Sequence, residues 1–167
     1  MTTRRAAVLG AALAVAAAAL AVGAWALSGD GEPDRQELVA ERGALVMPFD
    51  LERTTHVFAK SLDGGAQTVT ADDPDDAEQT ALIRTHLREE AAKFRRGEVG
   101  DPAAIHGMEM PGLAELQEGF RRFEIAYEEV PGGARIVYRA GDPALVGALH
   151  HWFDAQVVDH GADARED

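Results

Sequence analysis

The sequence predicts an α+β fold: two strand-strand-helix units that form a four-stranded antiparallel sheet with two helices on one face, preceded by an N-terminal apolar helix. Three observations predict it. The chain opens with a long apolar run, a pair of β-rich segments around a glycine turn occurs twice, and an Asp-Pro helix start follows each pair. Gly64 and Gly132 of the two turns lie 68 residues apart, and Pro74 and Pro143 of the helix starts lie 69 apart, which is the spacing of a repeated unit.

The apolar run, Ala6 to Leu27, follows the basic pair Arg4-Arg5. It is rich in alanine and ends in the small-x-small tripeptide 24–26, so residues 1–27 have the pattern of a cleaved signal peptide. The alternative is an uncleaved membrane anchor, because the run would span about 33 Å as a helix, enough to cross a bilayer. In both cases the basic pair stays in the cytoplasm. We therefore expect an exported protein, secreted or membrane-tethered, with an extracytoplasmic domain.

The acidic balance of the chain limits its partners. Of 167 residues, 16 are basic and 29 are acidic, for a net charge of -13. Such a field repels phosphate backbones and anionic lipids, so we expect no nucleic-acid partner and contact with a membrane only through the N-terminal segment. The sequence has no cysteine, which excludes disulfides, thiolate ligands and thiol catalysis. Cations are the ligands that the charge favours, and we expect a monomer.

Composition divides the chain into four parts. Residues 1–27 are the signal peptide or anchor, and residues 28–46 are a polar tether that ends in a short helix or an irregular segment. Residues 47–161 carry the regular patterns and form a single α+β domain, large enough to bury a core. Residues 162–167 are expected to be a disordered tail.

The first unit begins with two β-rich segments, 54–62 and 66–71, on either side of a Gly-Gly turn. This pattern predicts a β-hairpin. Asp73 is then the expected N-cap and Pro74 the first helical residue, because proline at that position loses no hydrogen bond. The helix is expected to cover residues 74–94 and to stop before the next glycine.

The second unit repeats this order. Residues 123–130 and 134–139 flank a Pro-Gly-Gly turn, and a helix follows from Pro143 to about Val158. Between the units, residues 100–112 contain several glycines and prolines, which favour a structured loop. This loop carries His106.

The first helix presents a histidine and a carboxylate on its inner side. At about 100° per residue, Ile83, Leu87 and Phe94 define a stripe that faces the core. His86 and Glu90 fall on or beside this stripe and are four residues apart, the spacing at which an imidazole and a carboxylate share a metal or a proton. The same spacing also fits an ordinary contact on a helix surface.

Three more histidines face the same region. His56 alternates with Phe58 on the first strand, so both point to the helices. His160 falls on the inward stripe of the last helix if that helix continues past Val158, and His106 comes from the joining loop. In a chain without cysteine, imidazoles and carboxylates suit Zn²⁺ or Cu²⁺. We therefore predict a transition-metal site with the ligands His56, His86, Glu90, His106 and His160.

The same residues allow other interpretations. A histidine near an apolar face is often a hydrogen-bonded core residue, and the protein would then be a non-catalytic interaction module of the cell envelope. His106 with Met108 and Met110 is a set that can hold Cu⁺, although loop methionines also fill gaps over a core. An enzyme ranks third, because the sequence contains neither a nucleophile elbow nor a phosphate-binding glycine loop.

Five segments carry a family resemblance: 55–58 (THVF), 70–74 (TADDP), 86–90 (HLREE), 105–112 (IHGMEMPG) and 148–161 (ALHHWFDAQVVDHG). Over residues 47–161 the chain resembles a family of small exported bacterial proteins of unestablished function. The resemblance implies a site at His56, His86, His106 and His160. Some members carry the label aspartate carbamoyltransferase, which the motifs here do not support, because that reaction needs an S-T-R-T-R-type phosphate loop that this sequence lacks.

Overall fold

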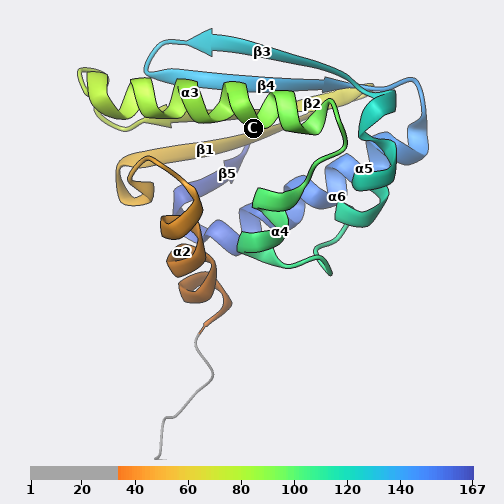
Figure 1. Ribbon diagram of the computed structural model, residues 1–167, viewed down its shortest axis with the longest axis horizontal. Coiled ribbons are helices and arrows are strands. Elements are labelled where there is room, and N and C mark those ends of the chain that lie inside the picture. Colours follow the sequence, from red (N-terminus) through yellow and green to blue (C-terminus); the bar gives the residue numbers. More distant parts are fainter. Residues whose placement is uncertain (1–33) are drawn as a thin grey trace, which may run out of the picture. The chain divides into compact units, whose positions relative to one another are not determined.

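The structure, a computed structural model, describes residues 34–167 (Figure 1). The expected signal peptide or anchor at 1–27, with its apolar helix, falls outside this range, as does the first part of the tether. Within residues 34–167, no helix combines the length and the apolar character that crossing a membrane requires.

The described chain has the predicted α+β class. Its five α-helices are α2 (Arg35–Val46), α3 (Ala77–Phe94), α4 (Gly100–His106), α5 (Leu113–Gly119) and α6 (Pro143–His160). Its strands are β1 (Thr54–Ser61), β2 (Gly64–Ala71), β3 (Glu124–Val130), β4 (Gly133–Arg139) and β5 (Ala164–Glu166). Three single-turn 3-10 helices connect them: η1 (Leu51–Arg53), η2 (Phe120–Arg122) and η3 (Gly161–Asp163).

The sheet contains five strands in the order β3-β4-β2-β1-β5. The hairpins β1–β2 and β3–β4 and the central pair β2–β4 are antiparallel, but β5 lies parallel to β1. The prediction of a four-stranded antiparallel sheet is therefore wrong, because a fifth strand joins the four expected ones and the sheet is mixed. This strand comes from residues 162–167, where a disordered tail was expected. A strand of three residues is too short to show the alternation by which strands are recognised.

The two long helices begin near their Asp-Pro signals, one of them later than predicted. Asp142 caps α6, since its side chain accepts a hydrogen bond at 3.0 Å from a backbone N–H of the first turn, which also contains Pro143. Asp76 caps α3 in the same way, since its side chain accepts a hydrogen bond at 3.0 Å from the backbone N–H of Gln79. Helix α3 therefore begins three residues after the expected Pro74. The side chain of Asp73 instead closes a turn ahead of the helix.

The long helices α3 and α6 pack against one face of the sheet (Figure 1). Phe58 of β1 packs on Phe153 of α6, with ring centroids 5.2 Å apart. Tyr138 of β4 contacts both Phe94 of α3 and Trp152 of α6. The apolar core therefore lies between this sheet face and the two helices.

A short helix, α4, occupies the first half of the loop expected at 100–112. Pro102 fits its first turn, where the missing N–H has no helical partner, and the helix ends at His106. Further on, Gly112 has a φ of 78°, and a Cβ there would lie 2.1 Å from the carbonyl oxygen of Ala148, so glycine lets the chain cross α6 closely. α2 packs on α4 and α6. These helices close the end of the core where the candidate residues gather.

Candidate metal centre

A cavity inside the domain is lined by all five predicted ligands. It lies among β1, α3, α4 and α6, and its volume is about 30 Å³, which is room for about two water molecules or a single ion. The predicted residues in its wall are His56 from β1, His86 and Glu90 from α3, His106 from α4 and His160 from α6. These side chains point into the cavity, the direction that strand and helix periodicity predicts. Their role as metal ligands stays a prediction.

Helix α3 directs two polar side chains into the cavity. His86 and Glu90 are one helical turn apart, and their exposed fractions are only 7% and 6%. Leu87 and Phe94 of the same helix are core residues that also line the cavity. The ring of Phe49 packs against His86 with centroids 5.7 Å apart. An imidazole and a carboxyl group are thus buried beside apolar side chains of the core.

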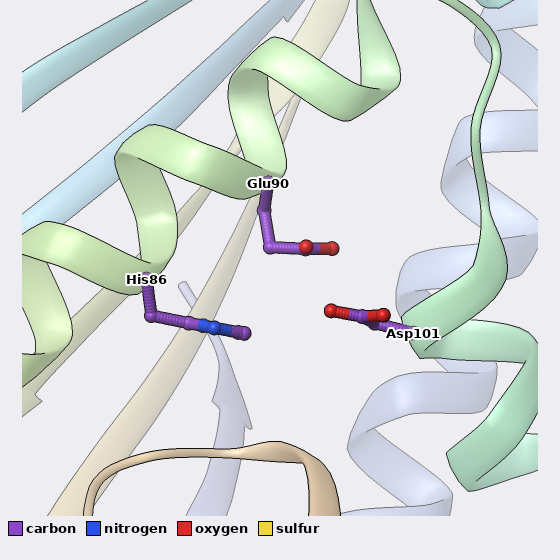
Figure 2. Close-up of side chains that lie close together, drawn as sticks. All are labelled: His86, Glu90 and Asp101. Carbon is purple, nitrogen blue, oxygen red and sulfur yellow. The ribbon is translucent and has the colours of Figure 1, made fainter.

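Asp101 of α4 completes a possible ligand group with this pair. One donor atom each of His86, Glu90 and Asp101 lies within 4.8 Å of the others. Figure 2 shows His86 and Glu90 projecting from α3, and Asp101 from α4, toward the same space. Two donors bound to one Zn²⁺ at about 2 Å are about 3.3 Å apart in a tetrahedral site. Small rotations of these side chains would therefore suffice to bind an ion.

Lys93 bridges the two carboxyl groups. Its Nζ donates hydrogen bonds to Glu90 Oε1 and to Asp101 Oδ2, each 2.7 Å long. Burial raises the pKa of Glu90 to about 7, although the hydrogen bond from Lys93 acts in the opposite direction. Burial also opposes the ionisation of Asp101, but the hydrogen bonds with Lys93 and Glu90 and the charge of Lys93 together outweigh it, so the pKa of Asp101 is lowered. One carboxyl group is therefore ionised at neutral pH, and the other titrates near it.

The remaining three histidines form a second group. The rings of His56 and His160 are stacked, with centroids 5.1 Å apart and planes inclined by 6°. The rings of His106 and His160 are 5.0 Å apart and inclined by 76°. A metal ion lies close to the plane of each imidazole that binds it, so two stacked rings share an ion only after one of them rotates. The donors already arranged around one point are therefore those of His86, Glu90 and Asp101.

His106 is oriented by a buried carboxylate. Its Nδ1 lies 2.8 Å from Asp159 Oδ2, and Arg35 donates to both carboxylate oxygens of Asp159 over 2.6 Å. Burial opposes the ionisation of Asp159, but the hydrogen bonds from Arg35 and His106 outweigh it and lower its pKa. Because Asp159 is ionised, Nδ1 of His106 is the protonated nitrogen and donates. Its Nε2 then keeps a lone pair, as in histidines whose second nitrogen is fixed by a carboxylate at metal sites.

Burial also keeps the imidazoles neutral. Burial, together with electrostatic repulsion from His86 and His106, lowers the pKa of His56 to about 4. Burial, together with repulsion from His56 and His106, lowers the pKa of His160 to about 3. It lowers the pKa of His86 and of His106 as well, although nearby carboxylates act in the opposite direction. Nδ1 of His56 has no hydrogen-bond partner among residues 34–167. Neutral imidazoles have the lone pair that binds a metal.

The sequence prediction did not include Asp101, Lys93, Asp159 or Arg35. Asp101 precedes a proline and therefore resembles a helix start, and Lys93 lies three residues after Glu90, a spacing that does allow contact on a helix. Asp159 and Arg35 are 124 positions apart, so no local pattern could connect them. In the sequence alone, these charged residues look like ordinary residues of a solvated surface, because their partners come close only in the folded chain.

The two methionines of the loop at 105–112 differ in burial. Met108 is 45% exposed, whereas Met110 is 4% exposed and belongs to the core. The two thioethers therefore lie in different environments, and Met110 fills a gap over the core. Of the other two histidines, His151 is exposed, and His150 Nε2 lies 2.8 Å from the carbonyl oxygen of Gly64. That contact fastens α6 to the β1–β2 hairpin.

In comparisons with known proteins, no family model, no curated protein sequence and no solved structure matches the chain. A functional assignment therefore depends on the geometry and the chemistry of the cavity.

Proposed function

We propose that this chain is an exported protein that binds one divalent transition-metal ion, Zn²⁺ or Cu²⁺, in the cavity between α3 and α4. The observation that carries the proposal is the ligand group of His86, Glu90 and Asp101, whose donor atoms lie within 4.8 Å of one another. One nitrogen and two carboxylate oxygens match the donors that these metals accept where thiolates are absent.

The size of the cavity supports binding of an ion. About 30 Å³ accommodates a metal ion with a water molecule, whereas organic ligands occupy pockets of roughly 300 Å³ or more. This cavity is therefore better suited to a small cation than to an organic ligand.

The second histidine group supports a transition metal over Ca²⁺ or Mg²⁺. His56, His106 and His160 line the same cavity as neutral imidazoles, and His106 is already oriented by Asp159. Hard cations prefer oxygen ligands, so imidazoles in the wall favour Zn²⁺ or Cu²⁺.

Export is the second part of the proposal. It is supported by the apolar run Ala6 to Leu27 behind Arg4-Arg5. Outside the cytoplasm, a chain with no cysteine would bind its metal with nitrogen and oxygen donors, which are not lost to oxidation.

A thermal shift experiment tests the metal site. The purified full-length chain, freed of metal with a chelator, should gain several degrees in melting temperature when Zn²⁺ or Cu²⁺ is added, because a ligand that binds only the folded state stabilises it. At a hundredfold excess over Kd the gain is about 2.7 kcal/mol. His86→Ala should abolish the gain, because it removes the only nitrogen of the ligand group.

The matched control is His151→Ala, which removes an exposed histidine outside the cavity and should leave the gain unchanged. A wild-type protein whose melting temperature does not respond to either metal would contradict the proposal. The histidines would then have a structural role, as expected for an interaction module of the cell envelope.

A further inference from the structure

We infer that Lys93 is a built-in competitor of the metal: its ammonium group occupies the two carboxylates in the metal-free protein, and an entering ion must displace it. This inference rests on the proposed metal site and concerns its regulation. The metal-free domain already contains a cation that can return to the site when the ion leaves.

The geometry of Lys93 matches that of a bound cation. Its Nζ is 2.7 Å from an oxygen of Glu90 and 2.7 Å from an oxygen of Asp101. Two of the three ligand residues of the site are therefore already engaged with a positive charge. A metal ion bound by the same two carboxylates would lie within a few ångströms of Nζ, where the repulsion between the two cations is strong in partly buried surroundings.

The ammonium group also explains how the metal-free domain keeps two acidic groups at this position. A buried carboxylate without a counter-ion is costly, and removal of one partner from a buried pair leaves the other uncompensated. Lys93 supplies the compensating charge in the metal-free state. The ion supplies it in the loaded state, so neither state contains two uncompensated carboxylates.

Lys93 lies at the solvent edge of the ligand group. Its side chain is 33% exposed and that of Asp101 is 29% exposed, compared with 8% for Glu90. The long, flexible stem can therefore swing into water without disturbing the core. Exchange of ammonium for metal therefore needs this movement of Lys93, together with small rotations of the ligand side chains.

Affinity measurements test the competition. Lys93→Gln keeps a polar side chain of similar length but removes the charge, so the affinity for Zn²⁺, measured against a chromophoric chelator, should rise by at least about fivefold, the lower end of typical coupling between two ligands. Arg96→Gln is the matched control, because Arg96 lies one turn further along and pairs with Glu98 outside the site. It should leave the affinity unchanged.

Chemical labelling tests the displacement in the wild-type protein. The chain has only two lysines, Lys60 and Lys93. Lys60 pairs with Asp154 and Glu166, so it is an internal control that is also bound by two carboxylates. Saturation with Zn²⁺ should raise the acetylation rate of Lys93 severalfold, measured by mass spectrometry, and should not change that of Lys60.

The outcomes separate this inference from the proposed function. If neither the wild type nor Lys93→Gln binds Zn²⁺, the proposed metal site itself is wrong. If the wild type binds Zn²⁺ but the substitution leaves the affinity unchanged and the labelling of Lys93 does not respond to metal, the metal site stands and the competition is wrong. Binding by Lys93→Gln alone would support the competition in its strongest form.

Discussion

The metal-free protein should lose at least about 3 kcal/mol of its free energy of unfolding between pH 7 and pH 4. The buried histidines cause the loss. The pKa of a histidine is near 6.5 in the unfolded chain, but it is about 4 for His56 and about 3 for His160 in the folded protein. Below pH 6.5 the unfolded state therefore binds more protons, and stability is lost as the pH falls toward the folded values. At pH 4 each of the two histidines costs about 3 kcal/mol.

Glu90 acts in the opposite direction. Its pKa is about 7 in the folded protein and 4.5 in the reference state, so the folded state binds more protons between these values and gains stability as the pH falls. This gain is about 3 kcal/mol and offsets about half of the loss from the histidines. The lowered pKa values of His86 and His106 add to the loss in the same pH range. Those of Asp101 and Asp159 add to it only in more acidic solution, below the ordinary aspartate range.

Urea unfolding in the presence of a chelator measures this dependence. Glu90→Gln should remove the offset and roughly double the loss between pH 7 and pH 4. His160→Gln should reduce the loss, because it removes one of the buried histidines that resist protonation. The exposed His151 provides the control substitution. A wild-type stability that stays constant over this range would contradict the presence of buried, neutral histidines.

Deletion of residues 162–167 should destabilise the protein by about 3 kcal/mol. The deletion removes β5, its parallel pairing with β1, and the buried side chain of Ala164. It also removes the bond from the backbone N–H of Asp167 to the carbonyl oxygen of Phe58. Each backbone hydrogen bond contributes about 1 kcal/mol net. The exposed edge of β1 then becomes available for pairing with other chains.

The same deletion should affect the site, because Ala164 lies opposite His56 in the sheet. Water reaching His56 would weaken the burial that lowers its pKa, so the acid-induced loss of stability should become smaller. Chemical denaturation of the truncated and full-length chains, compared over pH, measures both effects. Arg165→Ala, which changes an exposed residue of β5 and keeps the backbone pairing, is the control. Equal stability of the truncated and full-length chains would mean that these residues are a dispensable tail.

Periodicity predicted most of the framework. Two hairpins and two long helices follow from alternation, glycine turns and Asp-Pro starts, since each is a local signal extended over many residues. The short elements were missed for a physical reason. β5 exists because β1 has an open edge beside the end of α6, and three residues contain no pattern that reports this.

The sequence could predict the candidate site only through the direction in which each side chain points from its strand or helix. A side chain on a strand or helix points in the direction that its position dictates, so His56, His86, Glu90 and His160 could be assigned to the inner side. The stacking of His56 on His160 and the bridge from Lys93 to Asp101 depend on side-chain rotamers and on contacts between α3 and α4. These contacts form only when the helices pack, which is why Asp101 was missing from the prediction.

The place of Trp152 in the cavity wall has a practical consequence. It is the only tryptophan within residues 34–167, and it is 1% exposed. Its indole lines the cavity that contains the ligand group. Its fluorescence therefore distinguishes the two metals: paramagnetic Cu²⁺ in the cavity should quench the emission, whereas Zn²⁺, with its filled d shell, should leave the intensity largely unchanged. The two metals would thus be told apart by light from a residue that binds neither.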